Sequence, residues 1–133
     1  MTVNKIIIKK KDEIKKVERL LNKINLDFKL DEVKFVNLKI AVTEGLINAI
    51  NHGNKNDIAK NVYIEIKNNK NNLVVKIKDE GTGFDINSIP DPTSSENILK
   101  EHGRGIYIIK SLVDKFKCTS DKNGTLFILS MRK

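Results

Sequence analysis

Two neighbouring segments that alternate between apolar and polar residues constrain the fold most strongly. Residues 61–68 (NVYIEIKN) and 72–79 (NLVVKIKD) place apolar side chains at every second position, and a short turn rich in Asn and Lys joins them. This alternation is typical of strands with one buried face, and the short connection predicts an antiparallel hairpin. A hairpin with one apolar face needs a second layer of structure to cover it.

The N-terminal half of the chain predicts most of that second layer. Residues 3–10 are short and β-branched, which favours a first strand. Residues 12–25 carry apolar side chains at helical spacing. A second helix is expected from Asp31, a plausible N-cap, to about Asn51, with Gly53 ending it.

The C-terminal half predicts a long loop, a third helix and a second hairpin. The loop covers residues 80–102 and contains both prolines, the helix covers about 104–114, and the hairpin turns at Asn123-Gly124. With no internal repeat or linker, residues 1–133 are expected to form a single domain. The element order predicts an α+β fold, a two-layer sandwich with helices on one face of a mainly antiparallel mixed sheet.

The second predicted helix carries polar side chains where apolar ones are expected. It shows two apolar stripes, and Glu44, Asn48 and Asn51 are expected on or beside the one that begins at Val33. A buried carboxylate needs a cavity or a partner, and Glu44 and Asn48, four residues apart, can address one point. The alternative is a solvated helix end. The stripes are Val33, Val36, Ile40 and Ile47, and Phe35, Leu38, Val42 and Leu46.

Three glycine-containing motifs follow. DEGTGFD (79–85) comes directly after a strand, where Gly81 and Gly83 permit a tight turn or close approach of a ligand. HGRG (102–105) is expected just before a helix, which favours an anion site on free backbone amides or a flexible hinge. NGT (123–125) is by itself a hairpin turn. Each motif alone has an ordinary structural interpretation.

Composition and charge exclude several classes of protein. The chain has 25 Lys and Arg against 17 Asp and Glu, a net charge of +8, but its basic residues are dispersed and not interleaved with aromatics, which argues against a direct nucleic-acid partner. The single cysteine, Cys118, cannot form an internal disulfide and is expected to be a small strand hydrophobe. Short apolar runs predict no membrane span and no secretory signal, so a cytoplasmic location is expected.

The order and spacing of the motifs resemble the GHKL (histidine kinase-like) ATPase superfamily. More closely, AVTEGLINAINHGN, IKDEGTGFD, PDPTSSENILKEHGRGIYIIKSLVD and NGTLFIL are similar to the serine/threonine-protein kinases that act as anti-sigma factors. The resemblance implies a histidine kinase-like ATPase fold in which ATP and Mg²⁺ lie between the helices and the sheet, under an ATP lid at about residues 84–102. It also implies an ATP-dependent kinase that phosphorylates an anti-anti-sigma (antagonist) protein and sequesters a sigma factor by partner switching, with a homodimer as a further state.

The same resemblance implies a role for each matching residue. Glu44 corresponds to the general base, Asn48 to the Mg²⁺ ligand, and Asp79 to the acceptor for the adenine amino group. The remaining nucleotide-binding positions are Gly81 and Gly83 beneath the base, Phe84 in the lid, Gly103, Arg104 and Gly105 at the phosphates, and Thr125 beside adenine. The alternative interpretation of Arg104 is a solvated cation at the start of the helix, and the alternative interpretation of Phe84 is ordinary packing. No role is assigned to Glu101, whereas His52 and Arg19 are candidates for partner contact.

Three other functions remain as alternatives. The first is an ATP-binding regulatory module without significant kinase activity, although the presence of both Glu44 and Asn48 favours an active site. The second is the catalytic part of a histidine kinase, for which a partner would have to supply the phosphoacceptor, since His52 and His102 are the only histidines. The third is an ATPase of the chaperone or topoisomerase kind, for which this length leaves no room for a second domain.

Overall fold

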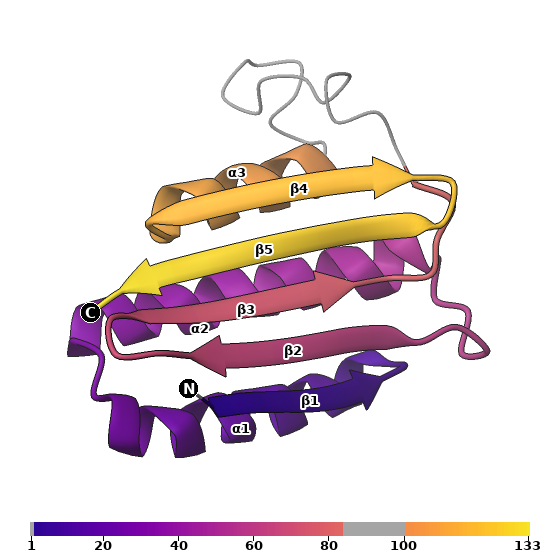
Figure 1. Ribbon diagram of the computed structural model, residues 1–133. Helices are drawn as coiled ribbons and strands as arrows, with labels where there is room; N and C mark the ends of the chain where they lie inside the picture. Colours follow the sequence, from indigo (N-terminus) through magenta and orange to yellow (C-terminus); the bar gives the residue numbers. More distant parts are fainter. Residues whose placement is uncertain (1, 84–100) are drawn as a thin grey trace.

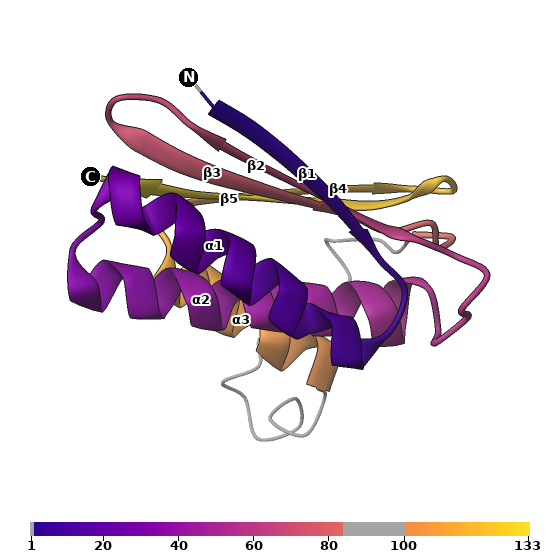
Figure 2. The same ribbon diagram turned by 90° about the horizontal axis from the view of Figure 1, so that it is seen from below.

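The computed structural model of the chain describes residues 2–83 and 101–133, and for residues 101–103 only the course of the backbone. Its elements form two layers, a five-stranded sheet and a layer of helices on one face of that sheet (Figures 1 and 2). The predicted α+β two-layer sandwich is therefore confirmed. None of the helices in the described ranges is long and apolar enough to cross a membrane.

The sheet has the strand order β1-β2-β3-β5-β4, and all four of its pairings are antiparallel. Both predicted hairpins are present, β2–β3 and β4–β5. The sheet carries buried side chains at alternate positions because only one of its faces meets the helices. The strands are β1 (Thr2–Ile8), β2 (Val62–Asn68), β3 (Asn72–Lys78), β4 (Lys115–Asp121) and β5 (Gly124–Arg132).

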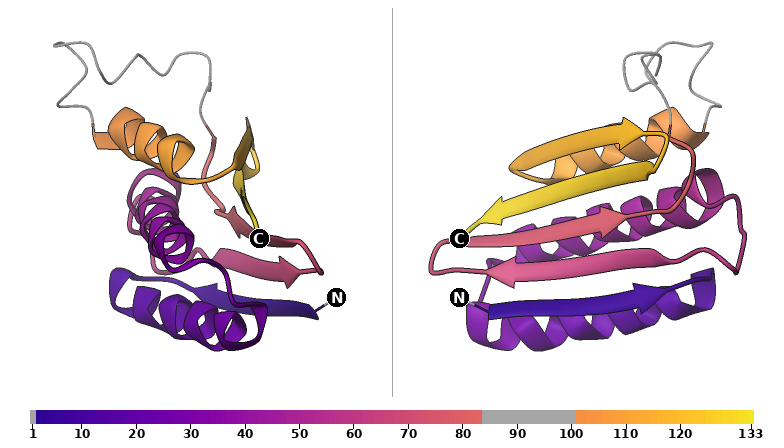
Figure 3. Two further views of the ribbon diagram at one scale, coloured as in Figure 1. Left: turned by 90° about the vertical axis from the view of Figure 1, so that its left-hand side faces the viewer. Right: turned by 45° about the vertical axis from the view of Figure 1, so that its right-hand side comes forward.

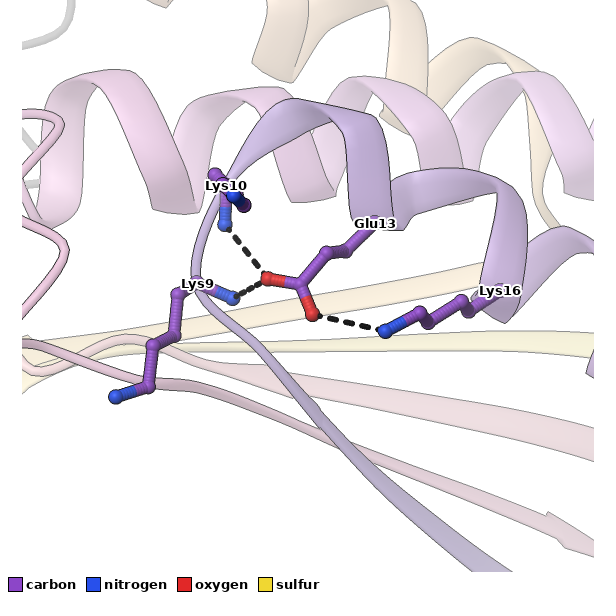
Figure 4. A network of polar contacts seen from close by, with 4 residues as sticks. All are labelled: Lys9, Lys10, Glu13 and Lys16. Atoms are coloured by element: carbon purple, nitrogen blue, oxygen red, sulfur yellow. Dashed lines mark hydrogen bonds and ion pairs between the residues drawn. The ribbon is translucent and has the colours of Figure 1, made fainter.

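The first helix, α1 (Ile14–Phe28), follows a 3-10 turn, Lys11–Glu13. The Glu13 carboxylate accepts hydrogen bonds from the backbone amides of Lys9 and Lys10 at 3.0 and 3.3 Å, and Lys16 Nζ donates to it at 3.2 Å (Figure 4). The pKa of Glu13 lies below its usual value. The main cause is the hydrogen bond from the Lys9 amide, and the second is the hydrogen bond from the Lys16 ammonium. This carboxylate fixes the corner between β1 and the helix layer.

The second helix, α2 (Glu32–Ile47), begins at the predicted N-cap, where the Asp31 side chain accepts a hydrogen bond from Lys34 N at 3.3 Å. It buries Leu38, Val42 and Leu46, one of the two predicted stripes.

The expectation that the other stripe is buried was wrong. Val33, Val36 and Ile40 are 68, 46 and 44% exposed, because α2 turns its opposite face toward the sheet. Glu44 therefore lies beside an exposed apolar strip, whereas Asn48 lies on the face of the helix that also buries Ala41 and Gly45.

The helix type changes after α2. The chain continues from α2 as a π-helix, Asn48–Gly53, and ends at Gly53 as predicted. The wider π-turn closes with a hydrogen bond from Asn54 N to Ala49 O at 2.8 Å. One extra residue per turn shifts the following side chains around the helix axis, and such turns are frequent at functional sites. Asn48, at the start of this turn, is buried.

The third helix, α3 (Glu101–Leu112), starts three residues earlier than predicted. Gly103 and Gly105 therefore lie inside the helix and do not precede it, and residues 101 and 102 of the predicted lid belong to the helix. Residues 84–100, the rest of the predicted lid, and Phe84 among them, lie outside the described residues. Figure 3 shows α3 in the helix layer beside α2, on the same face of the sheet.

Candidate functional site

One cavity lies where the end of the helix layer meets the end of the sheet. It has a volume of about 190 Å³ and joins residues from the π-helix, the segment after β3 and the start of β5. Four of the predicted site residues, Asn48, Asp79, Gly83 and Thr125, line this cavity. The lining residues are Asn48, His52, Gly53, Lys55, Asp79, Thr82, Gly83, Thr125 and Phe127.

The carboxylate of Asp79 is buried and held in one orientation. Its Oδ1 accepts hydrogen bonds from Gly81 N at 2.9 Å and Thr125 N at 3.0 Å, and its own backbone amide donates to Thr125 O at 3.0 Å. Two amide donors on one oxygen compensate for part of the cost of burying the charge. Within the described residues this leaves Oδ2 as the oxygen that can accept a hydrogen bond from a ligand.

The glycines around Asp79 are required by close packing. A Cβ at Gly53 would lie 2.0 Å from Asp79 Oδ2, and one at Gly81 would lie 2.1 Å from Gly53 O. Gly83 has a φ of +81°, in the region that side chains rarely adopt. Gly81 therefore allows the turn after β3 to touch the backbone of the π-helix, whereas Gly83 is required by its own backbone conformation and by its approach to Asp121 O.

Asn48 presents an unsatisfied carboxamide to the cavity. It is buried, and its Nδ2 has no hydrogen-bond partner in the part of the chain that the structure describes. Leaving a buried polar group without a partner costs about 1–3 kcal/mol. Because the nitrogen and oxygen of an amide are assigned from their surroundings, either can face the cavity. The amide nitrogen could donate to an acceptor on a ligand, whereas a metal would be bound through the amide oxygen.

Glu44 and Asn48 meet at Gly105 of α3. A Cβ at Gly105 would lie 2.7 Å from Asn48 Nδ2 and 3.5 Å from Glu44 Oε2. The prediction that both side chains address one point is therefore confirmed. Gly105 permits this approach because it has no side chain.

Glu44 does not line the cavity. It lines an adjacent groove of about 280 Å³ on the outer side of the helix layer, together with Glu18 of α1 and four further residues of α2. These four include the exposed apolar residues Val36 and Ile40. Their full set is Val36, Lys39, Ile40 and Thr43. The carboxylate thus stands at the boundary between the cavity and an open apolar surface.

Thr125 is buried at the start of β5, where its Oγ1 lies 2.8 Å from the Oγ of Ser120. Arg104 is exposed on α3 and is not among the cavity-lining residues. Only the first four amides of a helix lack an intrahelical acceptor, so in α3 Gly103 falls within this group and Gly105 just beyond it. The described geometry therefore gives Gly105 a packing role next to Asn48 and Glu44.

Sequence reasoning missed five lining residues, among them Gly53, which was predicted only as the end of a helix. His52 lies four residues after Asn48, so helical spacing could have placed it on the same face, but the π-turn makes that inference inexact. Lys55, which has a φ of 51°, and Thr82 lie in irregular segments that show no periodicity. Phe127 follows Thr125 by two residues, and its position on the cavity face of β5 is a signal that strand alternation provides.

Comparison with known proteins agrees with this geometry. Residues 8–133 match the family model described as histidine kinase-like ATPase domain. The chain is 27% identical over 109 residues to proteins named serine-protein kinase RsbW from Bacillus cereus (strain AH820) and Bacillus anthracis (strain CDC 684 / NRRL 3495). These alignments cover 77% of this chain and 66% of each relative, so the chain spans slightly less than two thirds of their length.

A solved structure shares the fold. The histidine kinase domain from the Erythrobacter litoralis EL346 blue-light activated histidine kinase superposes with a TM-score of 0.58 at 18% identity. The match covers 86% of this chain and 58% of that one. At this identity the likeness shows the arrangement of sheet and helices alone.

Proposed function

The chain belongs to the family of histidine kinase-like ATPase domains, and on that premise we propose that it binds ATP with Mg²⁺ and phosphorylates a serine or threonine of a protein. The similarity to proteins named serine-protein kinase supports the choice of acceptor. One observation carries the proposal: Glu44 and Asn48 approach the same point at Gly105, yet Asn48 faces the cavity and Glu44 faces an open groove.

Asp79 and Thr125 form the proposed base-recognition end of the cavity. The fixed orientation of Asp79 leaves Oδ2 to accept the amino group of adenine, and a charge-assisted bond of this kind is worth roughly 1.5–3 kcal/mol. Thr125 adds a hydroxyl on the same side of the cavity. Gly81 and Gly83 let the base approach the backbone.

Asn48 is the residue that fits a metal. Its unsatisfied carboxamide supplies the kind of oxygen ligand that Mg²⁺ accepts, alongside phosphate oxygens. When bound, Mg²⁺ would neutralise charge on the phosphoryl group during transfer. The start of α3 offers backbone amides to the phosphates, with Gly103 as the proposed close-approach residue and Arg104 as a proposed cation near the terminal phosphate.

Glu44 is the proposed general base. A carboxylate one helical turn from the metal ligand can accept the proton of an incoming hydroxyl, and its place at the groove makes it accessible from outside the nucleotide cavity. A small substrate would enter through the cavity, whereas a serine on a protein surface would approach over the groove. The exposed Val36 and Ile40 offer such a protein an apolar contact surface.

The resemblance in sequence extends the proposal to biological partners. We propose that residues 1–133 act as one ATPase domain and as an anti-sigma factor in the cytoplasm. The chain would hold a sigma factor and exchange it for the antagonist that it phosphorylates. Exchange requires that the nucleotide state changes the affinity for the two partners differently. Arg19 on α1 is a proposed partner contact, and a homodimer is the proposed assembly.

The test is co-purification with and without ATP, followed by mapping of phosphorylated residues on the proteins retained. The proposal predicts a serine or threonine phosphate on a retained protein with the wild type and none with Glu44→Gln. Nucleotide-dependent retention without any phosphate on the partner would instead favour the regulatory module without kinase activity.

A further inference from the structure

Asn54, directly after the π-helix, connects three segments, two of which, the π-helix and the turn after β3, border the cavity. It is 1% exposed, and its backbone amide closes the π-turn on Ala49 O. Its Nδ2 donates to Asn61 O at 3.0 Å, just before β2, and its Oδ1 accepts from Glu80 N at 2.8 Å, in the turn after β3. One side chain therefore joins the helix layer to both strands of the central hairpin.

These hydrogen bonds lie beside the direct contact between the π-helix and the Asp79 turn. Glu80 is the residue after Asp79, and Gly53 is the residue before Asn54. A Cβ at Gly81 would meet Gly53 O, and a Cβ at Gly53 would meet the side chain of Asp79, so neither position admits a side chain. A displacement of Glu80 N therefore also moves its two neighbours in the chain, Asp79 and Gly81.

We propose that Asn54 is a positioning residue that holds the base-recognition end of the nucleotide cavity at a fixed distance from its phosphate end. Asn48, on the π-helix, lines one end, and Asp79, after β3, lines the other. Nucleotide binding needs both groups at a separation that matches one ligand. Asn54 sets that separation without touching the ligand, since it is not among the cavity-lining residues.

The expected effect of a substitution at Asn54 depends on the hydrogen-bonding groups that it leaves without a partner. In Asn54→Ala, Glu80 N and Asn61 O both lose their side-chain partner in a partly buried position. A buried group left without a partner costs about 1–3 kcal/mol, which favours movement of the turn toward water. If Asp79 moves with the turn, the amides that bond to its carboxylate lose their acceptor.

The first readout uses the apo protein and needs no nucleotide. Amide hydrogen exchange at Gly81 and Thr125, both of which donate to Asp79 Oδ1, reports the position of that carboxylate. Asn54→Ala should accelerate exchange at both amides by about tenfold relative to core amides of β3. The exchange rate at Thr125 is the deciding measurement, because Thr125 has no hydrogen bond to Asn54 and would respond only through a movement of Asp79. Unchanged exchange at Thr125 in a folded Asn54→Ala protein would overturn the assignment.

A matched control separates positioning from general loss of stability. Asn25, at the end of α1, also holds a backbone amide with its side chain, since its Oδ1 accepts from Leu30 N at 2.8 Å. Asn25→Ala should lower the unfolding temperature and leave exchange at Gly81 and Thr125 slow.

Asn54→Asp is the second variant. It keeps the acceptor for Glu80 N and places a carboxylate oxygen against Asn61 O, which lowers the stability of the whole protein. Exchange at both reporter amides should therefore stay as slow as at core amides of β3 in the same variant. Faster exchange at Thr125 than at those core amides would contradict the proposal even where Asn54→Ala does not fold.

The second readout is ATP affinity by calorimetry in the presence of Mg²⁺, and it rests on the proposed function. Asn54→Ala should bind ATP about tenfold more weakly than the wild type, a loss of about 1.4 kcal/mol, while Asn25→Ala stays within about twofold. Wild-type ATP affinity in Asn54→Ala would overturn the positioning role. A wild type that binds no ATP would refute the proposed function, whereas the exchange experiment would still decide whether Asn54 holds Asp79.

Discussion

Gly105 of α3 packs against Asn48 so closely that a Cβ at position 105 would lie 2.7 Å from Asn48 Nδ2. The contact brings the third helix, the π-helix and the carboxylate of Glu44 together at one point. It links the cavity proposed to bind nucleotide to the groove where a protein acceptor is proposed to bind.

Gly105→Ala is therefore expected to impair both ATP binding and phosphoryl transfer. The added methyl group would push Asn48 out of place, and overpacking of this kind costs about 1–3 kcal/mol. Calorimetry with Mg-ATP and a transfer assay measure the two effects. Ser111→Ala, an exposed position on the same helix, is the control and should behave as wild type. Full activity in Gly105→Ala would show that the contact does not matter for the site.

Glu44→Gln is expected to separate binding from chemistry. The substitution keeps the shape of the side chain and removes the proton acceptor, so Mg-ATP affinity should remain within about threefold while transfer to the acceptor protein falls by roughly 10²–10⁴-fold. Glu18→Gln, which also lines the groove but lies on α1, is the matched control. Equal transfer rates for Glu44→Gln and the wild type would exclude Glu44 as the base.

Asn48→Ala is expected to abolish the dependence of ATP affinity on Mg²⁺. Its carboxamide is the proposed metal ligand, so removing it should weaken binding with Mg²⁺ and leave the weaker binding without Mg²⁺ almost unchanged. Titrations with Mg²⁺ and with a chelator measure this difference. A variant that still gains as much affinity from Mg²⁺ as the wild type would contradict the role of Asn48.

The thiol of Cys118 is expected to resist alkylation at neutral pH. Burial raises its pKa to about 11, and the negative charge of Asp79 acts in the same direction. Against the ordinary value of 9.0, this predicts roughly 100-fold slower alkylation at pH 8 than in the denatured chain. Between pH 9 and 11 the unfolded chain releases this proton first, so the stability that Cys118 contributes should fall as pH rises. Equal alkylation rates in the folded and denatured states would contradict the burial of Cys118.

The layers of the fold could be predicted from sequence because alternation and helical spacing are local properties. Segments 61–68 and 72–79 identified the hairpin, and Asp31 and Gly53 identified the ends of a helical region. The buried face of α2 could not be chosen, since both stripes were apolar and only tertiary packing decides between them. The start of α3 was missed because glycine usually ends or precedes a helix, whereas Gly105 lies inside one for close packing.

Part of the candidate site could also be predicted, because the order of the motifs can be read from the sequence. Motif order brought Asn48, Asp79 and Thr125 to one cavity, where the structure places them. The bonds of Asn54 depend on the π-turn, which has no simple signature in the sequence. The groove at Glu44 depends on which face of α2 packs against the sheet. The roles assigned to these residues in binding and catalysis stay predictions.

The central claim is that the cavity between Asn48 and Asp79 binds ATP. Calorimetric titration of Mg-ATP into the wild type and Asp79→Asn tests it most directly, because the substitution removes one charge and keeps the shape that Gly81 and Thr125 hold. We predict saturable binding to the wild type and a loss of roughly 10–100-fold in Asp79→Asn, as expected for a charge-assisted hydrogen bond. Absence of binding to the wild type, or equal affinity in the two proteins, would contradict the claim.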